Sequence, residues 1–158
     1  MIRRLLPWAA LLALPFSLLL VRRIERRRLV PQPRGIVLGL YAGVPDYDYA
    51  AELDHIRDSG ATAVSLQAIY RMDTGHSTEI RRHPTSSPTE ESLRRTFYQA
   101  KVRGLRMMFF PTLNMRDEAD NADWWRGNIA PDDWALWWRN YTAFNVRLAT
   151  LAQEGGVE

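Results

Sequence analysis

A three-part pattern recurs along this chain and limits the folds that it can adopt. Each repeat begins with an apolar run, continues through a polar loop into an amphipathic helix, and ends at a glycine. The apolar runs cover residues 36–42, 61–70 and 105–113. Strands that alternate with helices form right-handed βαβ units, so the pattern predicts a parallel sheet.

The third apolar run contains Met107-Met108-Phe109-Phe110 and shows no alternation of apolar and polar residues. It is also too short to cross a membrane. A short continuous apolar run is typical of a parallel strand that is covered on both faces. We therefore expect this strand to be buried and to deliver a functional loop at its end.

Local signals place the first two helices. Asp48 is the expected N-cap of the first helix, and Tyr49, Leu53 and Ile56 follow at helical spacing. The segment Ser87-Pro88-Thr89-Glu90 has the pattern of a capping box, with Ser87 as the N-cap of the second helix. Gly60 and Gly104 are the expected ends of these two helices.

The third helix is expected to begin near Pro131 and to end at Gly155-Gly156. Its apolar stripe includes Trp134, Trp137 and Trp138, which we expect in the core. Val157 and Glu158 have the pattern of the first residues of a fourth apolar run.

The loops differ in length in a way that favours one fold class. The longer loops all follow strands, whereas a glycine or two connects each helix to the next strand. A (β/α) barrel has this asymmetry, because its site is built on loops at the carboxyl ends of the strands. An open doubly wound sheet fits the alternation equally well, but no Gly-x-Gly-x-x-Gly follows the first strand.

The N-terminal residues are expected to lie outside this domain. Residues 1–4 form a short tail, residues 5–21 an apolar transmembrane anchor, and residues 22–34 a basic juxtamembrane linker. A cleaved signal peptide would end in small residues, whereas Leu18-Leu19-Leu20-Val21 leads straight into Arg22-Arg23, so an uncleaved anchor is favoured. The folded domain is expected to cover residues 35–158.

Charge is distributed unevenly between these parts. Residues 1–34 hold eight Arg and one Glu, and the whole chain has a net charge of +3, so residues 35–158 carry −4. An acidic domain argues against a nucleic-acid partner, and the basic linker suits lipid headgroups or a solvated surface.

Signals for membrane orientation conflict. More Arg follows the apolar segment than precedes it, which by the positive-inside rule would keep the domain in the cytoplasm. The short tail with Arg3 and Arg4 is instead typical of a signal anchor that exports the domain behind it. We predict a single-pass membrane protein with its domain on the extracytoplasmic side.

Candidate binding residues follow from position at strand ends and in the loops beyond them. They are Tyr41, Tyr70, His76, Glu79, Asn114, Trp125 and Arg126. Aromatic faces suit sugar rings and an Arg offers several donors. Other roles fit as well: Trp125 can pack on the third helix, Arg126 can pair with a loop carboxylate such as Asp123, and His76 and Glu79 can be solvated or cap-forming.

Metal and cofactor chemistry finds little support in the sequence. The chain contains no Cys, and His55 and His83 have no partner at a metal-ligand spacing. Neither a metal site nor a cofactor is expected.

Several segments together resemble family 113 of the glycoside hydrolases. The resemblance covers nearly all of residues 36–158. The segments are Tyr41-Ala42, Tyr47-Asp48-Tyr49, Gly60-Ala61-Thr62-Ala63-Val64-Ser65, His76-Ser77-Thr78-Glu79-Ile80, Thr89-Glu90-Glu91-Ser92-Leu93, Gly104-Leu105-Arg106-Met107-Met108 and Trp125-Arg126-Gly127-Asn128-Ile129. The resemblance implies a TIM barrel that acts on β-mannans.

This sequence departs from the family pattern in two respects. Family members carry a Lys-Pro-His segment leading to an Asp on the third strand, where this chain has Phe110-Pro111-Thr112 and Asn114. The family's general acid/base Glu follows the fourth strand and its nucleophile Glu comes later, beyond residue 158. Because retaining glycosidases need both carboxylates, no residue of this chain is assigned a catalytic role.

The resemblance thus implies the first three βα units of a (β/α)8 barrel, the N-terminal part of a longer enzyme. The leading hypothesis is a membrane-anchored, glycoside-hydrolase-like protein that binds or acts on a β-linked polysaccharide or oligosaccharide of the mannan type. The alternative is a non-enzymatic, membrane-tethered α/β module that binds envelope glycan or a partner protein.

Overall fold

A computed structural model describes residues 32–115 and 126–158 of the chain. The predicted tail and anchor, and most of the basic linker, lie outside the described residues. None of the helices in the described part is long and apolar enough to cross a membrane. Residues Arg34–Glu158 form a compact unit.

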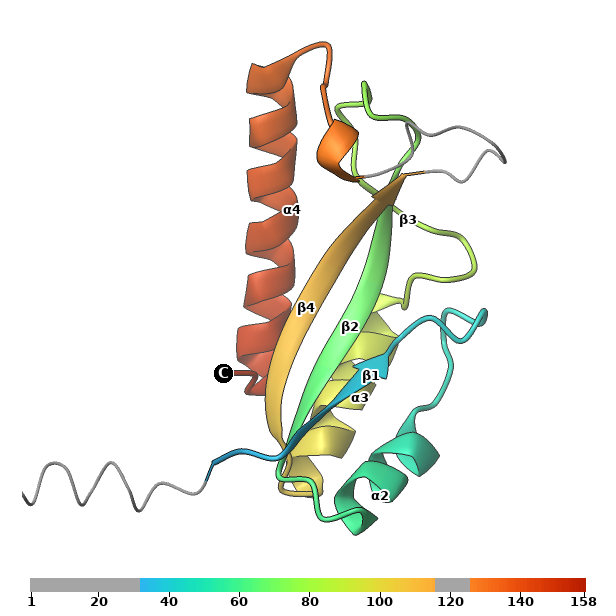
Figure 1. The fold of residues 1–158 in the computed structure, drawn as a ribbon, viewed down its shortest axis with the longest axis vertical. Coiled ribbons are helices and arrows are strands. Elements are labelled where there is room, and N and C mark those ends of the chain that lie inside the picture. Colours follow the sequence, from blue (N-terminus) through green and yellow to red (C-terminus); the bar gives the residue numbers. More distant parts are fainter. Residues whose placement is uncertain (1–31, 116–125) are drawn as a thin grey trace, which may run out of the picture. The chain divides into compact units, whose positions relative to one another are not determined.

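Strands and helices alternate along this unit, as Figure 1 shows. In chain order they are β1 (Gly35–Gly39), α2 (Ala50–Asp58), β2 (Ala63–Met72), β3 (Arg81–Arg82), α3 (Glu90–Val102), β4 (Arg106–Met115), the 3-10 turn η2 (Arg126–Asn128) and α4 (Trp134–Gly155). The three strands predicted from apolar runs are present, and so are the three predicted helices.

Strand β2 is the centre of the sheet. Strand β1 pairs with it in parallel, with Gly35 opposite Ala63, and β4 pairs in parallel along its whole length, from Arg106 opposite Ala63 to Met115 opposite Met72. The predicted parallel sheet is therefore confirmed. The two-residue strand β3 pairs antiparallel with Tyr70 and Arg71 and was not predicted, because it lies within the expected polar loop.

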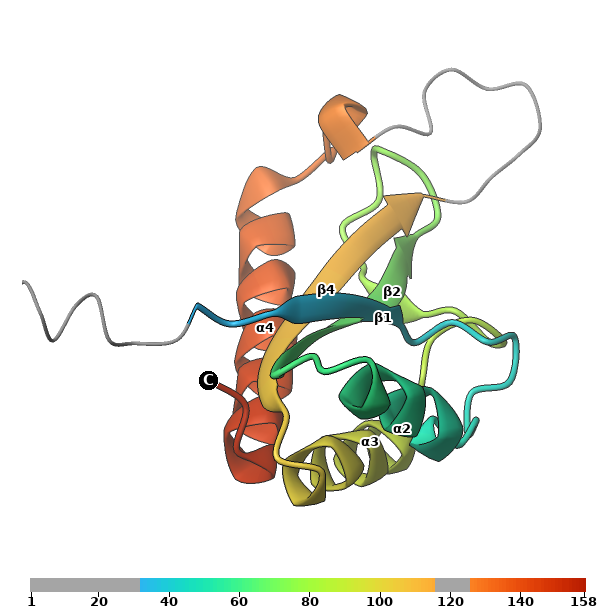
Figure 2. The same ribbon diagram turned by 60° about the horizontal axis from the view of Figure 1, so that its bottom comes forward.

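The sheet has one covered face. Alternate residues of β2, from Val64 to Met72, are buried. Those from Val64 to Tyr70 pack with apolar side chains of the helices such as Leu53, Phe97 and Leu148. Figure 2 shows these helices along one side of the sheet. The larger of two apolar clusters therefore joins β2 to α2, α3 and α4.

The opposite face differs from the expectation of a strand covered on both sides. Met108 and Phe110 alternate with the buried Met107 and are 54% and 53% exposed, and Val37 of β1 is exposed as well. In the part of the chain that the structure describes, no element covers this face. We call it the open face.

Helix boundaries follow the predicted signals with small shifts. Thr89, not Ser87, is the N-cap of α3, and its hydroxyl accepts a hydrogen bond of 3.0 Å from the backbone N–H of Ser92. Ser87 is instead buried, where its hydroxyl accepts from the His83 N–H and donates to the Ile69 carbonyl. It therefore ties the loop after β2 back to the strand.

Helix α4 begins at Trp134 with Asp133 as its N-cap and closes with Gly156 in the left-handed conformation, at a φ of 78°. The expected burial of all three tryptophans is wrong for two of them. Trp137 is 6% exposed, whereas Trp134 and Trp138 are 50% and 54% exposed. The apolar stripe of α4 is wider than the face of the helix that packs into the domain. Trp134 and Trp138, at the side of the stripe, therefore remain at the surface.

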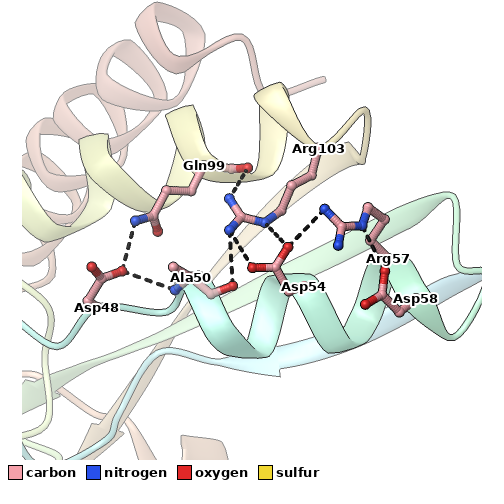
Figure 3. A network of polar contacts seen from close by, with 7 residues as sticks. All are labelled: Asp48, Ala50, Asp54, Arg57, Asp58, Gln99 and Arg103. Carbon is pink, nitrogen blue, oxygen red and sulfur yellow. Dashed lines mark hydrogen bonds and ion pairs between the residues drawn. The ribbon is translucent and has the colours of Figure 1, made fainter.

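A polar network fastens α2 to α3, as Figure 3 shows. Arg103, the C-cap residue of α3, donates to both carboxylate oxygens of Asp54, at 2.8 and 3.0 Å, and to the carbonyl oxygens of Ala50 and Gln99. The Gln99 amide donates to Asp48, which also accepts from the N–H of Ala50. The prediction that Asp48 is the N-cap of α2 is wrong: Tyr49 is the N-cap, and Asp48 lies one residue before it.

Candidate functional site

Parallel pairing brings the carboxyl ends of β1, β2 and β4 to one edge of the sheet. The loops that follow these strands therefore gather there, which is the position of the site in a (β/α) barrel. We call this edge the carboxyl rim. The described residues after β4 resume at Arg126, so Trp125, one of the predicted binding residues, lies outside them.

Asn114 and Arg126 meet at the rim. The Arg126 guanidinium donates to the side-chain oxygen of Asn114 at 3.3 Å and to the carbonyl oxygen of Leu113 at 3.4 Å. Both side chains are exposed. The structure thus joins two predicted site residues through an amide and a backbone carbonyl. The loop carboxylate considered as a partner, Asp123, lies outside the described residues.

A cavity of about 520 Å³ opens beside Arg126. It lies between the second half of β4 and the first half of α4, and Gln67 of β2 also reaches it. The lining residues are Gln67, Phe110, Pro111, Thr112, Leu113, Arg126, Ile129, Trp137, Tyr141, Phe144 and Asn145. Its volume and its mixture of aromatic walls with a few polar groups are typical of a small-molecule site.

Gln67 and Thr112 supply a polar pair to this cavity that was not predicted. The Gln67 amide donates to the Thr112 hydroxyl at 3.1 Å across neighbouring strands. Gln67 is out of step with the buried residues of β2, and Thr112 lies two residues from the exposed Phe110, so both side chains are on the side of the open face. Thr112 itself is buried there. The available signal was Gln67 itself, a polar residue inside the apolar run 61–70.

Aromatic side chains form the opposite wall. Trp137 and Tyr141 stack with their ring planes 10° apart and centroids 4.8 Å apart. A small apolar cluster of Met72, Met115 and Trp137, with Ile129 packed against it, supports the rim. Flat aromatic surfaces next to hydrogen-bonding groups suit a sugar ring, whose faces are apolar and whose edge carries hydroxyls.

His76 and Glu79 lie in the loop after β2, and both already have partners. His76 Nδ1 lies 3.3 Å from Asp132 Oδ1, and Glu79 forms an ion pair with Arg81. These side chains are exposed, so a ligand would compete with existing interactions.

The two predicted tyrosines occupy different faces. Tyr41 is exposed, and its ring lies directly over Gly39, where an added Cβ would clash with it. Tyr70 is 3% exposed and packs edge to face against Phe144 in the helix-covered core. Burial raises the pKa of Tyr70 to about 12. The structure therefore places Tyr41, but not Tyr70, outside the helix-covered core.

Three carboxylates of the two loops have cationic or histidine partners. Asp73 lies 3.4 Å from Arg71 and 3.5 Å from Arg81, Glu79 pairs with Arg81, and Asp132 lies beside His76. No cluster of three or more potential metal ligands occurs within residues 32–115 and 126–158. The arrangement offers binding groups, and no pair of rim carboxylates is assigned to acid–base chemistry.

One protein family matches most of this chain. The profile of glycoside hydrolase family 113 matches residues 45–158. No curated protein sequence matches the chain.

Solved structures share the fold. The complex structure of a family 113 β-1,4-mannanase is 21% identical with a TM-score of 0.67, and another structure of a family 113 β-1,4-mannanase is 22% identical with the same TM-score. The family 113 β-mannanase AaManA from Alicyclobacillus acidocaldarius, in complex with ManMIm, is 22% identical with a TM-score of 0.69.

Each match covers 80% of this chain and 42–43% of the other, so this chain spans less than half the length of these structures. The described unit thus corresponds to part of a TIM-barrel fold. Because the family profile extends over residues 45–158, well over half of the sequence, the chain belongs to glycoside hydrolase family 113.

Proposed function

We propose that the carboxyl rim of this domain binds a β-1,4-linked mannan or mannooligosaccharide as part of a glycoside hydrolase. The observation that carries the proposal is the cavity of about 520 Å³ beside Arg126, with hydrogen-bonding groups on one side and stacked aromatic rings on the other. Family membership and the similarity to solved β-mannanase structures support the choice of sugar.

Each part of the cavity has a role in this proposal. Arg126 and the Gln67–Thr112 pair hydrogen-bond sugar hydroxyls, and the aromatic wall with Tyr141 packs against apolar sugar faces. Asn114 holds the Arg126 guanidinium at the rim.

The other predicted binding residues lie outside the cavity lining. Tyr41, His76 and Glu79 are exposed and are proposed to contact sugar units beyond the cavity. Tyr70 is too deeply buried to take part.

The proposal separates binding from turnover. Binding is assigned to the rim residues described above, and none of them is assigned an acid–base role. Residues 5–21 are proposed to anchor the domain at a membrane, because their apolar run is followed by a basic linker. The extracytoplasmic side is proposed because the short tail with Arg3 and Arg4 is typical of a signal anchor.

Calorimetric titration of the 158-residue chain with β-1,4-mannohexaose tests the binding site. Arg126→Ala should weaken binding about tenfold, because a charged donor to a sugar hydroxyl is lost. Arg139→Ala is the matched control: it removes the same charge from an exposed position of α4 that does not line the cavity. No saturable binding by the unmodified chain, or equal losses in the two variants, would contradict the proposal.

A further inference from the structure

The loop after β2 is joined to the segment after β4, although the two are far apart in the sequence. The Ala130 N–H donates to the Gly75 carbonyl at 2.9 Å, and the Asp132 N–H donates to the His76 carbonyl at 3.2 Å. The Asn140 amide of α4 donates to the Thr78 carbonyl at 3.0 Å. Two loops of the carboxyl rim therefore form one connected unit.

Gly75 lies at the closest approach of these two segments. A Cβ on Gly75 would lie 2.7 Å from the carbonyl oxygen of Asn128, which is shorter than any ordinary contact, and 3.5 Å from Met115 Sδ. The φ of Gly75 is not in the left-handed region, so glycine is needed at this position for space and not for backbone conformation. The obstacle is a backbone atom, which cannot rotate away as a flexible side chain can.

The atom that Gly75 accommodates belongs to the same short turn as Arg126. That turn, η2, spans Arg126–Asn128, and the hydrogen bond from Ala130 to Gly75 fixes the chain two residues beyond it. Arg126 reaches Asn114 and Leu113 from this turn. A shift of the turn away from Gly75 would therefore move the guanidinium relative to the cavity.

We propose that Gly75 is a positioning residue: its missing side chain lets the loop after β2 hold η2, and thereby Arg126, in the geometry that binds sugar. This inference rests on the proposed sugar-binding function. It assigns a role to a residue that need not touch the ligand.

Two measurements on Gly75→Ala test the proposal, with Gly35→Ala as the matched control. A Cβ on Gly35 meets its nearest atoms at 3.9 Å, an ordinary contact, so this control adds a methyl group without a clash. The first measurement is amide hydrogen exchange without ligand. In Gly75→Ala the amides of Ala130 and Asp132 should lose protection, while the β2 and β4 amides keep it.

The second measurement is titration with β-1,4-mannohexaose. Gly75→Ala should bind about tenfold more weakly, because the Arg126 contact is misplaced, and Gly35→Ala should bind as the unmodified chain does. Should Gly75→Ala not fold, Asn140→Ala releases the same loop from α4 without a clash, and the same loss of protection and affinity is expected.

The outcomes separate this inference from the function on which it rests. An unmodified chain that does not bind the sugar refutes the proposed function, and the positioning role of Gly75 with it. Binding that is equal in Gly75→Ala and the unmodified chain leaves the function intact and overturns the positioning role. Unchanged protection of Ala130 and Asp132 in Gly75→Ala overturns the role independently of any ligand.

Discussion

Gln67 and Tyr70 lie three residues apart on β2, and their side chains point to opposite faces of the sheet. Tyr70 lies closer to the carboxyl end of the strand, so position along the sequence made it a reasonable candidate for binding. Alternation along the strand decides otherwise: Tyr70 faces the helices, and Gln67 faces the open side.

The buried hydroxyl of Tyr70 gives a prediction for alkaline pH. Burial raises the pKa of Tyr70 from 10.0 to about 12, so the unfolded chain loses this proton before the folded chain does. Stability should therefore fall as the pH rises from about 10 to about 12, by roughly 1.4 kcal/mol for each unit of difference.

Tyr70→Phe isolates this effect, because it removes only the hydroxyl. In urea titrations, the variant should lose less stability than the unmodified chain between pH 9 and pH 11.5, which are chosen to bracket roughly the ordinary tyrosine value. Its affinity for mannohexaose at neutral pH should not change. A large loss of affinity would instead return Tyr70 to the binding site.

At the scale of elements, β-strand and helix patterns predicted the arrangement well because each helix buries one apolar face against the sheet. The sequence did not predict β3, because Arg81 and Arg82 carry no strand pattern and pair only where the loop returns to Tyr70 and Arg71. Only part of the candidate site was predicted, because contacts between strands are not visible in the sequence. Strand ends are visible in a sequence, whereas the Gln67–Thr112 contact depends on the register between strands.

Pro111 lies in the middle of β4, and a proline is compatible with a strand only where its nitrogen faces away from the paired strand. The Arg106 N–H donates toward β2, whereas the Met107 carbonyl accepts from Glu158 on the other edge of the strand. Alternation places the nitrogen of Pro111 on this second edge, away from β2. Because a proline on an open edge removes no hydrogen bond from the pairing with β2, the residue is compatible with a strand.

The network around Arg103 gives a prediction for the packing of α2 on α3. Arg103→Ala should lower the free energy of unfolding by about 1–2 kcal/mol in urea titrations, because several hydrogen bonds between the helices are lost together. Arg57→Ala is the control: Arg57 contacts Asp54 and Asp58 from an exposed position, so we expect a much smaller change than from Arg103→Ala.

The same network should weaken in acid. Hydrogen bonding by Arg103 lowers the pKa of Asp54 below its ordinary value of 3.8, so this stabilisation is present above that pH and is lost as the pH falls through the folded-state pKa. The stability difference between the unmodified chain and Arg103→Ala should therefore shrink in strong acid. A difference that stays constant with pH would show that Arg103 acts through packing and its carbonyl hydrogen bonds, and not through Asp54.

At the scale of the whole domain, one face of the sheet is packed and the other is open in the described residues. Met108 and Phe110 are exposed on the open face, although the sequence pattern of their strand predicted burial, and Val37 is exposed there as well. An apolar run shows only that a strand is compatible with burial on both faces. Which partner covers each face cannot be learned from the run itself.

Substitutions on the two faces should differ in how much they change the free energy of unfolding. Met108→Gln should change the free energy of unfolding by less than about 0.5 kcal/mol and reduce the binding of a hydrophobic fluorescent dye, because its side chain is already exposed. Leu66→Ala, on the packed face of the neighbouring strand, should cost about 2–5 kcal/mol. A loss from Met108→Gln as large as that from Leu66→Ala would show that the open face is covered in solution.

The central claim is that the carboxyl rim beside Arg126 binds a mannan-type sugar. Its most direct test is a titration of the isotope-labelled 158-residue chain with β-1,4-mannotetraose, followed by nuclear magnetic resonance. We predict saturable shifts that concentrate at Gln67, Thr112, Arg126 and Asn145, which line the cavity. An absence of shifts, or shifts confined to the α2–α3 side of the domain, would contradict the account.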